Sequence, residues 1–193
     1  MAKNISEADG ILLLKIAKES IRQELEKQGE ALASLKTCVS KAVLEENRGV
    51  FVSLHKKGDL RGCIGNIEPV KTIFEGVVDN AKHAAFHDTR FNPLSREELM
   101  ETAIEVSILT RPENLDYTDA DDLIKKLRPG IDGVIVKKRY KSATFLPQVW
   151  NQLEDPGSFL SHLCMKAGLR PDEWKSGGLS VVTYQVQVFE EKQ

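Results

Sequence analysis

Cysteine is scarce in this sequence, and its copies are widely spaced. The 193 residues include only Cys38, Cys63 and Cys164, and no C-x-x-C pair occurs. An odd, dispersed set argues against a disulfide framework and against a zinc ribbon. We therefore expect a protein of a reducing compartment, the cytoplasm, with no bound metal and no cofactor.

The sequence also lacks an excess of charge of one sign and lacks long hydrophobic runs. The 27 Lys and Arg residues oppose 29 Asp and Glu residues, and the net charge of −2 gives no general attraction to nucleic acid or to an anionic membrane. The apolar run Ile11–Leu14 stops at Lys15, far short of a membrane span or a signal-peptide core. These absences predict a protein that binds no membrane and no specific nucleic acid.

Repeats, low-complexity tracts and Pro- or Ser-rich linkers are absent too. At about 150 residues per domain, the length favours one domain over residues 1–193. A chain of this size buries roughly 70% of its unfolded surface, so its core needs neither disulfides nor a metal for stability.

Hydrophobic periodicity predicts the elements of the first half. Ser6 and Asp9 form an N-cap signature for a helix that Gly29 ends, and a period of two over residues 49–65 predicts a β-hairpin. A helix with a broad apolar stripe then follows Pro69. Hairpins combined with helices imply an α+β fold with a mostly antiparallel sheet flanked by helices.

The second half alternates short helices with strands. Ser95 and Glu98 form a capping box for one helix. Periodicity further predicts strands at residues 104–109 and 182–188, and a hairpin whose first strand is 131–136 and whose turn is 137–141. It also predicts helices at residues 120–127, 147–153 and 158–167. Residues 32–44 fit a short helix and irregular packing equally well.

The segment Leu60-Arg61-Gly62-Cys63-Ile64-Gly65 is the densest functional signal. Strand alternation places Arg61 and Cys63 on one face, and a cation beside a thiol favours the nucleophilic thiolate. Cys63 is therefore a candidate catalytic residue, with Arg61 as its activating cation. Gly62 and Gly65 indicate a bulge or the close approach of a ligand or another backbone, which makes them candidate binding residues. The alternative is a buried structural cysteine, with Arg61 paired to a surface carboxylate.

Two histidines and an arginine lie near the end of the helix that follows Pro69. His83 and His87 are four residues apart, a spacing that metal pairs use, but Ala84 stands where a carboxylate would be needed and no third ligand is evident. We expect no metal there and keep either histidine, His87 first, as a proton carrier. Arg90 either binds an anion bidentately or satisfies helix-end carbonyls while pairing with Asp88.

Two segments of the second half offer weaker candidates. The turn at residues 137–141 carries four cations and could touch phosphate, although a solvated hairpin tip is the commoner explanation. Phe145 and Trp150, with Gln148 between them, provide apolar walls and an amide for a pocket, against the alternative of core packing.

Several segments together resemble one known family. The matching segments, in chain order, are residues 49–54, 60–65, 88–91, 132–134 and 143–150. On these residues the chain is similar to the AMMECR family, whose prokaryotic members are called AmmeMemoRadiSam system protein A. The hexapeptide at 60–65 is highly specific. Residue 89 is Thr where many relatives have Pro, and the turn at 137–141 is more basic than theirs.

The resemblance implies an α+β fold in a larger and a smaller lobe, and Memo-type and radical-SAM proteins as partners. It establishes no activity. The family site, carried onto this sequence, comprises Arg61, Gly62, Cys63 and Gly65, with Arg90, Thr144 and Gln148 as further binding residues.

Three hypotheses for function remain open. The first is thiol-dependent chemistry on a small or modified substrate, with Cys63 as nucleophile. The second is a non-catalytic module that binds RNA, a peptide or an anionic ligand in the same groove, and the third makes the hexapeptide purely structural. The first hypothesis predicts that Cys63 is the most reactive thiol, that its reactivity depends on Arg61, and that Cys38 and Cys164 label slowly.

Overall fold

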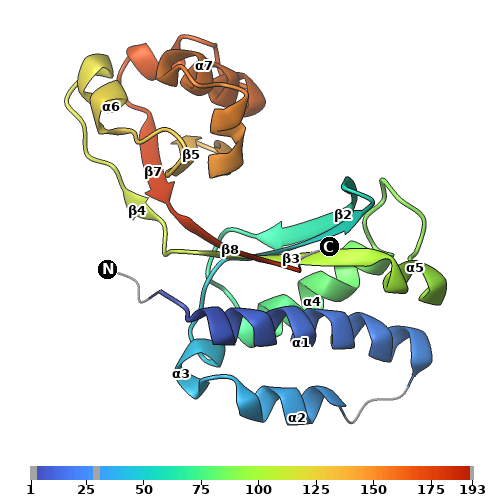
Figure 1. Ribbon diagram of the computed structural model, residues 1–193. Helices are drawn as coiled ribbons and strands as arrows, with labels where there is room; N and C mark the ends of the chain where they lie inside the picture. The colour runs from blue at the N-terminus through green and yellow to red at the C-terminus, as the bar shows by residue number, and fades with distance from the viewer. Residues whose placement is uncertain (1–3, 28–30, 192–193) are drawn as a thin grey trace. The chain divides into compact units, whose positions relative to one another are not determined.

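The chain folds into two compact units. The computed structural model describes residues 4–27 and 31–191 (Figure 1). The larger unit combines Met1–Arg111 with Gln187–Gln193, and the smaller unit is Pro112–Val186. The α+β class and the two lobes of unequal size are as predicted. Among the described residues, no helix combines the length and the apolar character that a membrane crossing needs.

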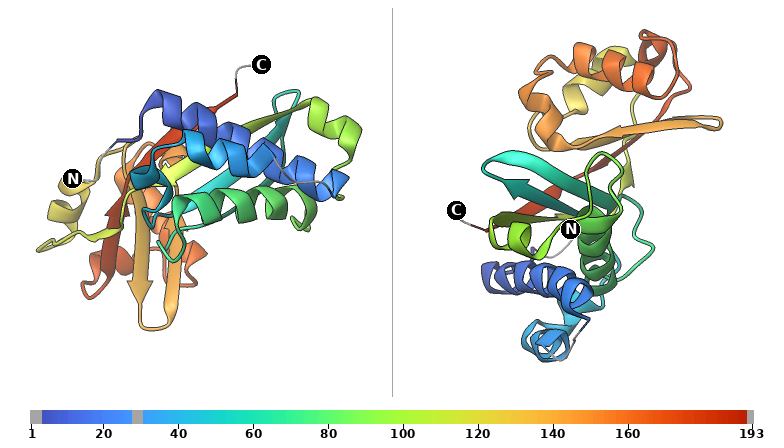
Figure 2. Two further views of the ribbon diagram at one scale, coloured as in Figure 1. Left: turned by 90° about the horizontal axis from the view of Figure 1, so that it is seen from below. Right: turned by 90° about the vertical axis from the view of Figure 1, so that its right-hand side faces the viewer.

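A four-stranded sheet in the order β2-β1-β3-β8 forms the larger unit, and β1 pairs antiparallel with both β2 and β3. Its strands are β1 (Val50–Lys56), β2 (Asp59–Asn66), β3 (Thr102–Leu109) and β8 (Val186–Glu190). Three apolar residues of β1 are fully buried and share one face of the sheet with apolar residues of β3; they are Val50, Val52 and Leu54. Helices α1 (Glu7–Glu26) and α4 (Ile73–Phe86) cover that face (Figures 1 and 2).

Helix caps decide where these helices begin. The Ser6 side chain caps α1 by accepting from the Asp9 amide, as predicted, whereas Gly29, the predicted end, lies outside the described residues. Helix α4 begins after Thr72 rather than directly after Pro69. The cause is a local capping box that competes with the proline signal, in which the Thr72 and Glu75 side chains each accept from the other residue's backbone amide.

Short helices complete the larger unit. Residues 32–44, left open by their pattern, form most of α2 (Ala31–Cys38) and α3 (Lys41–Leu44). The Ser95 side chain caps α5 (Arg96–Met100) by accepting from the Glu98 amide, as the capping box predicts. Helix α5 thereby carries Glu98 to the start of β3, where it contributes to the site described below.

The smaller unit holds the sheet β4-β7-β5-β6, and all of its pairs are antiparallel. Its elements are β4 (Glu113–Asn114), α6 (Ala120–Lys126), β5 (Gly133–Lys138), β6 (Lys141–Phe145), η1 (Pro147–Asn151), α7 (Pro156–Lys166), η2 (Glu173–Lys175) and β7 (Ser180–Tyr184). Figure 2 shows α7 beside the β5–β6 hairpin. The Trp150 ring stacks on Phe159 at 3.7 Å and its indole N–H donates to the Asp132 carbonyl. Trp150 is thus a core residue, which favours core packing, one of the two alternatives for this segment, over a pocket.

The final strand predicted at residues 182–188 is two strands. It breaks at Gln185, with β7 in the sheet of the smaller unit and β8 in the sheet of the larger unit. Period-two alternation continues through the break, so the pattern contains no sign of the change of sheet. The chain therefore passes from one unit to the other twice, once after Arg111 and once near Gln185.

Candidate functional site

The hexapeptide lies in β2, the edge strand of the larger unit, and contains a β-bulge. The register passes from Leu54 opposite Gly62 to His55 opposite Leu60, which leaves Arg61 as the extra residue. A bulge re-aims the side chains beside it, so simple alternation does not run from Arg61 to Cys63. The expected shared face for these two residues therefore has no support from the register.

Both glycines of the hexapeptide stand where a side chain would collide. A Cβ on Gly62 would lie 2.3 Å from the Ala84 carbonyl oxygen of α4, and one on Gly65 would lie 2.2 Å from the Phe51 ring. Gly62 thus allows the strand to approach the α4 backbone closely, as its position in a strand predicts. This close packing holds the backbone next to Cys63 in place.

Cys63 belongs to a row of polar side chains across three strands, the Cys63 row, made of Cys63, Ser53 and Glu105. Ser53 of β1 lies opposite both Cys63 of β2 and Glu105 of β3, so the three side chains share one sheet face. The Ser53 hydroxyl donates to Cys63 Sγ at 3.3 Å. Glu105 also accepts from the Ser107 hydroxyl at 3.2 Å, and its Oε2 lies 3.8 Å from His55 Nε2.

Three residues on this face were not predicted from the sequence: Ser53, His55 and Glu105. The alternation of β1 already separates Ser53 and His55 from the buried Val52 and Leu54. Which residues of β2 and β3 lie opposite them depends on the register, and the bulge in β2 makes that register hard to infer. The missed residues place a hydroxyl, a carboxylate and an imidazole on the sheet face that carries the thiol.

A loop after α4 binds the open edge of β2 at Cys63 through the Asp88–Arg90 clamp, made of these two side chains. Asp88 Oδ2 accepts from the Cys63 amide at 2.9 Å, and Arg90 Nη2 donates to the Cys63 carbonyl at 3.3 Å. Arg90 also donates to both carboxylate oxygens of Asp88, at 2.9 and 2.7 Å. These hydrogen bonds from Arg90 hold the pKa of the buried Asp88 carboxyl well below its usual range, although burial opposes the shift.

The clamp answers one question that the sequence left open. Of the two alternatives for Arg90, the pairing with Asp88 is present, and the carbonyl that it reaches belongs to Cys63 rather than to the helix end. The cation in contact with residue 63 is therefore Arg90.

Arg61 lies beside the clamp and binds a different carboxylate. Its Nε and Nη2 donate to Glu98 of α5 at 3.2 and 3.0 Å, and Nη2 also donates to the Asn92 carbonyl at 2.8 Å. The Arg61 hydrogen bonds lower the pKa of Glu98 to about 2. An open depression of about 440 Å³ lies here, lined by Arg61, Thr89, Arg90, Phe91, Asn92 and Glu98.

The two candidate histidines face each other at the end of α4. The rings of His83 and His87 are 5.4 Å apart at 64°, and both residues are exposed. In the part of the chain that the structure describes, no cluster of three or more His, Cys, Asp or Glu side chains is arranged to hold a metal ion. No contact places either ring at Cys63, so a proton-carrying role for His87 remains a prediction.

Thr144 and Gln148 belong to the smaller unit. The Thr144 hydroxyl donates to the Val134 carbonyl at 2.9 Å and lies 2.9 Å from the Tyr184 hydroxyl. Burial raises the pKa of Tyr184 to about 12, so this phenol remains neutral. Gln148 is exposed on η1. The contacts of Thr144 thus lie within its own unit.

The remaining cysteines differ in exposure. Cys164 is fully buried in α7, and burial raises the pKa of its thiol. Cys38 is exposed at the end of α2, and its thiol contacts the Ser34 carbonyl at 3.5 Å. Slow labelling therefore has a structural basis at Cys164, whereas the Cys38 thiol is accessible and its slow labelling stays a prediction.

The basic turn at 137–141 is partly engaged within its own unit. Lys138 pairs with Glu173, and Lys141 donates to the Gly168 carbonyl. Tyr140 at its tip is 89% exposed. These contacts favour the solvated hairpin tip over a phosphate site.

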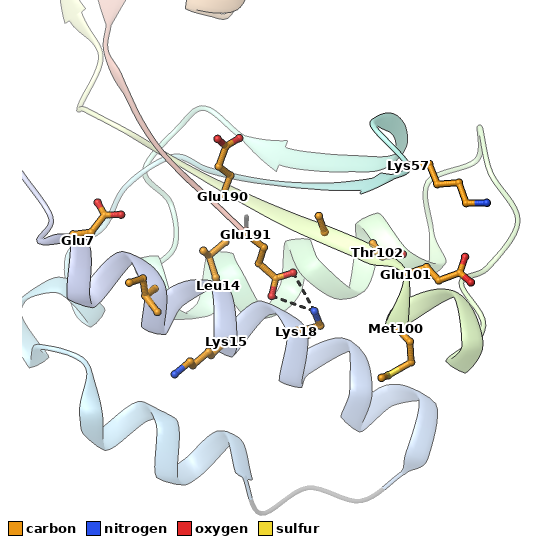
Figure 3. Close-up of a pocket in the computed structure, with 12 residues that line it drawn as sticks. Glu7, Leu14, Lys15, Lys18, Lys57, Met100, Glu101, Thr102, Glu190 and Glu191 are labelled. Atoms are coloured by element: carbon orange, nitrogen blue, oxygen red, sulfur yellow. Dashed lines mark hydrogen bonds and ion pairs between the residues drawn. The ribbon is translucent and has the colours of Figure 1, made fainter. Parts of the chain in front are cut away.

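A larger groove of about 860 Å³ lies elsewhere in the larger unit, beside α1 and the ends of β3 and β8 (Figure 3). Ile11 and Met100 supply exposed apolar surface, and Lys18 pairs with Glu191 at 3.0 Å. Glu191 also accepts from the Ile104 amide. None of the predicted site residues lines this groove.

The architecture and the site define the class of the protein. It is an α+β protein of two antiparallel sheets, with a cysteine-containing edge strand held by an aspartate and an arginine. The AMMECR1 family model matches residues 14–189, and the chain belongs to the AMMECR1 family.

Relatives and a solved structure agree with this assignment. A protein of Methanothermobacter thermautotrophicus is 40% identical over 188 residues, which cover 97% of this chain and 96% of the relative. One of Thermofilum pendens is 38% identical over 198 residues, at 97% and 92% coverage. The crystal structure of an uncharacterized Pyrococcus horikoshii protein is similar with a TM-score of 0.83 and 33% identity, covering 97% of this chain and 94% of that one.

Proposed function

We propose that this protein carries out thiol-dependent chemistry on a small or modified substrate, with Cys63 as the nucleophile. The observation that carries the proposal is the hydrogen bond from the Ser53 hydroxyl to Cys63 Sγ, within the Cys63 row. A hydroxyl donor stabilises a thiolate more than a neutral thiol, because the anion is the stronger acceptor.

Two further features support a reactive rather than a structural role. The Cys63 backbone is fixed on both sides by the Asp88–Arg90 clamp, so the thiol is presented from a rigid segment. Its side chain is only partly buried, unlike that of Cys164, which has no exposed surface. A partly accessible thiol on a fixed backbone is the arrangement that a nucleophile needs.

The test is the order in which the thiols react. The native protein is treated with limiting iodoacetamide, and each cysteine is quantified by peptide mass spectrometry, with Cys63→Ser as the control for site assignment. We expect Cys63 to label faster than Cys38, although Cys38 is the more exposed thiol, and Cys164 to label only on unfolding. Protection of Cys63 in the folded protein would contradict the proposal and leave the thiol a structural role.

The partners implied by the family resemblance belong to this proposal as well. Memo-type and radical-SAM proteins are its expected partners. Co-purification from the native source with Cys63→Ser as bait tests this expectation, because a partner that binds the site without reacting with the thiol would be retained.

A further inference from the structure

The sheet face that carries Cys63 also carries an imidazole. His55 lies two residues after Ser53 on β1, so the two side chains project from the same face. Cys63 is directly opposite Ser53 and therefore diagonal to His55. Diagonal neighbours on antiparallel strands are about 7–8 Å apart at the backbone, a separation that an aromatic side chain can span. The strand pairing thus brings an imidazole within reach of the thiol.

Glu105 lies beside one nitrogen of this ring. Its Oε2 is 3.8 Å from His55 Nε2, and its Oε1 accepts from the Ser107 hydroxyl. Nε2 is buried and has no hydrogen-bond partner within the described ranges of the chain. A movement of less than about 1 Å would give a protonated Nε2 the carboxylate as its acceptor. The other ring nitrogen, Nδ1, is then left to accept a proton.

The His55 ring has room to turn towards the thiol. Its side chain is 32% exposed. The residues opposite it are Leu60 of β2, which is itself exposed, and Ala103 of β3, which is small. Hydrogen bonds of a catalytic site are often longer in a structure without substrate than in the reacting complex. A change in the orientation of this ring is therefore the one movement that proton transfer requires.

We propose that His55 is the general base that takes the proton of the Cys63 thiol, and that Glu105 positions its ring. The inference rests on the proposed function, because it names the proton acceptor of the same nucleophile. In this step the S–H bond of Cys63 breaks, its electron pair stays on sulfur, and an N–H bond forms at His55 Nδ1. The Ser53 hydroxyl stabilises the resulting thiolate, and Glu105 stabilises the imidazolium.

An imidazole suits this proton better than the carboxylate of the Cys63 row does. Free cysteine titrates at about 8.5, histidine at about 6.5 and glutamic acid at about 4.3. A carboxylate is therefore a weaker base than a thiolate by about four orders of magnitude, and an imidazole by only about two. Attraction between thiolate and imidazolium reduces the second difference further. Glu105 thus acts on the ring rather than on the thiol.

The other charged side chains around this face are mostly paired with one another. The pairs are Arg90–Asp88, Arg61–Glu98, Lys56–Glu98 and Lys56–Glu101. Glu190 of β8 points away from α1, so it adds a negative charge on the Cys63 side of the sheet (Figure 3). Negative charge there favours the imidazolium and disfavours the thiolate, and the two effects oppose each other. The pH dependence of the step therefore belongs to Cys63 and His55 as a coupled pair.

The test is the pH dependence of Cys63 alkylation by iodoacetamide, measured by peptide mass spectrometry on the full-length protein from about pH 6 to 9.5. An unassisted thiol reacts about tenfold more slowly for each pH unit below about 8.5. In the parent we expect a nearly flat rate between about pH 8 and 6.5, where the thiolate–imidazolium pair persists.

His55→Gln should lose the flat region. At about pH 6.5 its Cys63 should react at least about tenfold more slowly than that of the parent. At about pH 9.5 the two rates should agree within about twofold, because the thiol is then ionised without a base. Agreement at high pH also shows that the variant is folded and that its thiol is equally accessible.

Two further variants separate positioning from charge. Glu105→Gln should slow alkylation by about threefold at about pH 6.5, because the imidazolium loses its counter-ion. A carboxylate that acted only as a negative charge near the thiol would have the opposite effect, since its removal would favour the thiolate. His162→Gln is the matched control, because His162 is an exposed histidine of α7 in the smaller unit, and its pH profile should equal that of the parent.

The ultraviolet absorbance of the thiolate gives a second readout that needs no reagent. The difference between the parent and Cys63→Ser at neutral pH should show a thiolate, and the same difference in the His55→Gln background should not. An unchanged pH profile in His55→Gln, faster alkylation in Glu105→Gln, or a flat region that is lost in His87→Gln instead would overturn the assignment of His55. Fast labelling of Cys63 would in those cases still support the proposed function, whereas protection of Cys63 at every pH would overturn both.

Discussion

The Asp88–Arg90 clamp makes the sharpest prediction for stability, through the substitution Asp88→Asn. The Asp88 carboxylate accepts hydrogen bonds from the Cys63 amide and from Arg90, and its side chain is only 4% exposed. The amide keeps the shape of the side chain and one acceptor oxygen. It loses the negative charge and leaves Arg90 without its counter-ion.

The expected loss of stability follows from the burial of Asp88, which is one of the two partners of the ion pair. Removing one partner of a fully buried ion pair costs about 3–5 kcal/mol. Arg90 is 55% exposed, so water can solvate its guanidinium group once the carboxylate charge is removed. We therefore expect the unfolding free energy to fall by about 2–3 kcal/mol. Asp79→Asn is the matched control, because Asp79 also lies 2.7 Å from its cation, Lys71, but is 41% exposed. Its expected cost is below about 0.5 kcal/mol.

The difference in unfolding free energy between the parent and Asp88→Asn depends on pH in a defined direction. The pKa of Asp88 is lower in the folded than in the unfolded chain, so the unfolded chain binds more protons as the pH falls. The contribution of the clamp is complete above the ordinary aspartate value of about 3.9 and is lost as the pH falls through the folded-state value. The gap between parent and Asp88→Asn should therefore be constant from about pH 7 to 5 and narrow below about pH 4.

Urea denaturation of both variants and the parent, followed by circular dichroism, measures these differences. Equal, small losses for Asp88→Asn and Asp79→Asn would refute the reasoning, since the clamp would then contribute no more than a surface ion pair. A gap that widens towards low pH would contradict the assigned charge state of Asp88.

Three further predictions follow from the fold and composition. Gly62→Ala should lower the unfolding free energy by about 1–3 kcal/mol, because the new methyl group would lie 2.3 Å from the Ala84 carbonyl oxygen. An unchanged midpoint in urea denaturation would contradict the close packing. Calorimetry should show one unfolding transition, as the single-domain hypothesis for residues 1–193 requires. The reason is that β8 completes the sheet of the larger unit only after the chain has passed through the smaller unit. Two separate peaks would refute the single-domain hypothesis. RNA binding at about 0.15 M salt should be no tighter than micromolar and independent of sequence, and selective binding well below that range would reverse this prediction.

Local signals in the sequence predicted much of the fold. The caps at Ser6 and Ser95 and the hairpin at 49–65 depend on residues close together in the chain, so their patterns suffice. The start of α4 differs from the prediction because the capping box of Thr72 and Glu75 competes with the helix-start signal of Pro69. The division of the last strand was not predictable from alternation, which is the same in both sheets.

The candidate site was only partly predictable for a different reason. The hexapeptide and the Asp88–Phe91 segment were singled out separately, and the contact between Cys63 and Asp88 joins them across 25 residues of chain. Ser53 and Glu105 could not be predicted as site residues, because their proximity to Cys63 depends on strand register. Arg61 was expected to activate the thiol, yet the bulge directs its guanidinium group to Glu98. Periodicity identifies the residues of a strand but does not locate a bulge.

The most direct test of the central claim, that the Cys63 row activates the thiol, is the rate of Cys63 alkylation in Ser53→Ala. One hydrogen bond contributes about 1 kcal/mol, so its loss should slow alkylation at neutral pH by about fivefold. Arg61→Gln should have a smaller effect, because that guanidinium is bound to Glu98. Labelling of Cys38 serves as the internal reference in each sample. A rate at Cys63 that is unchanged in Ser53→Ala would contradict the account.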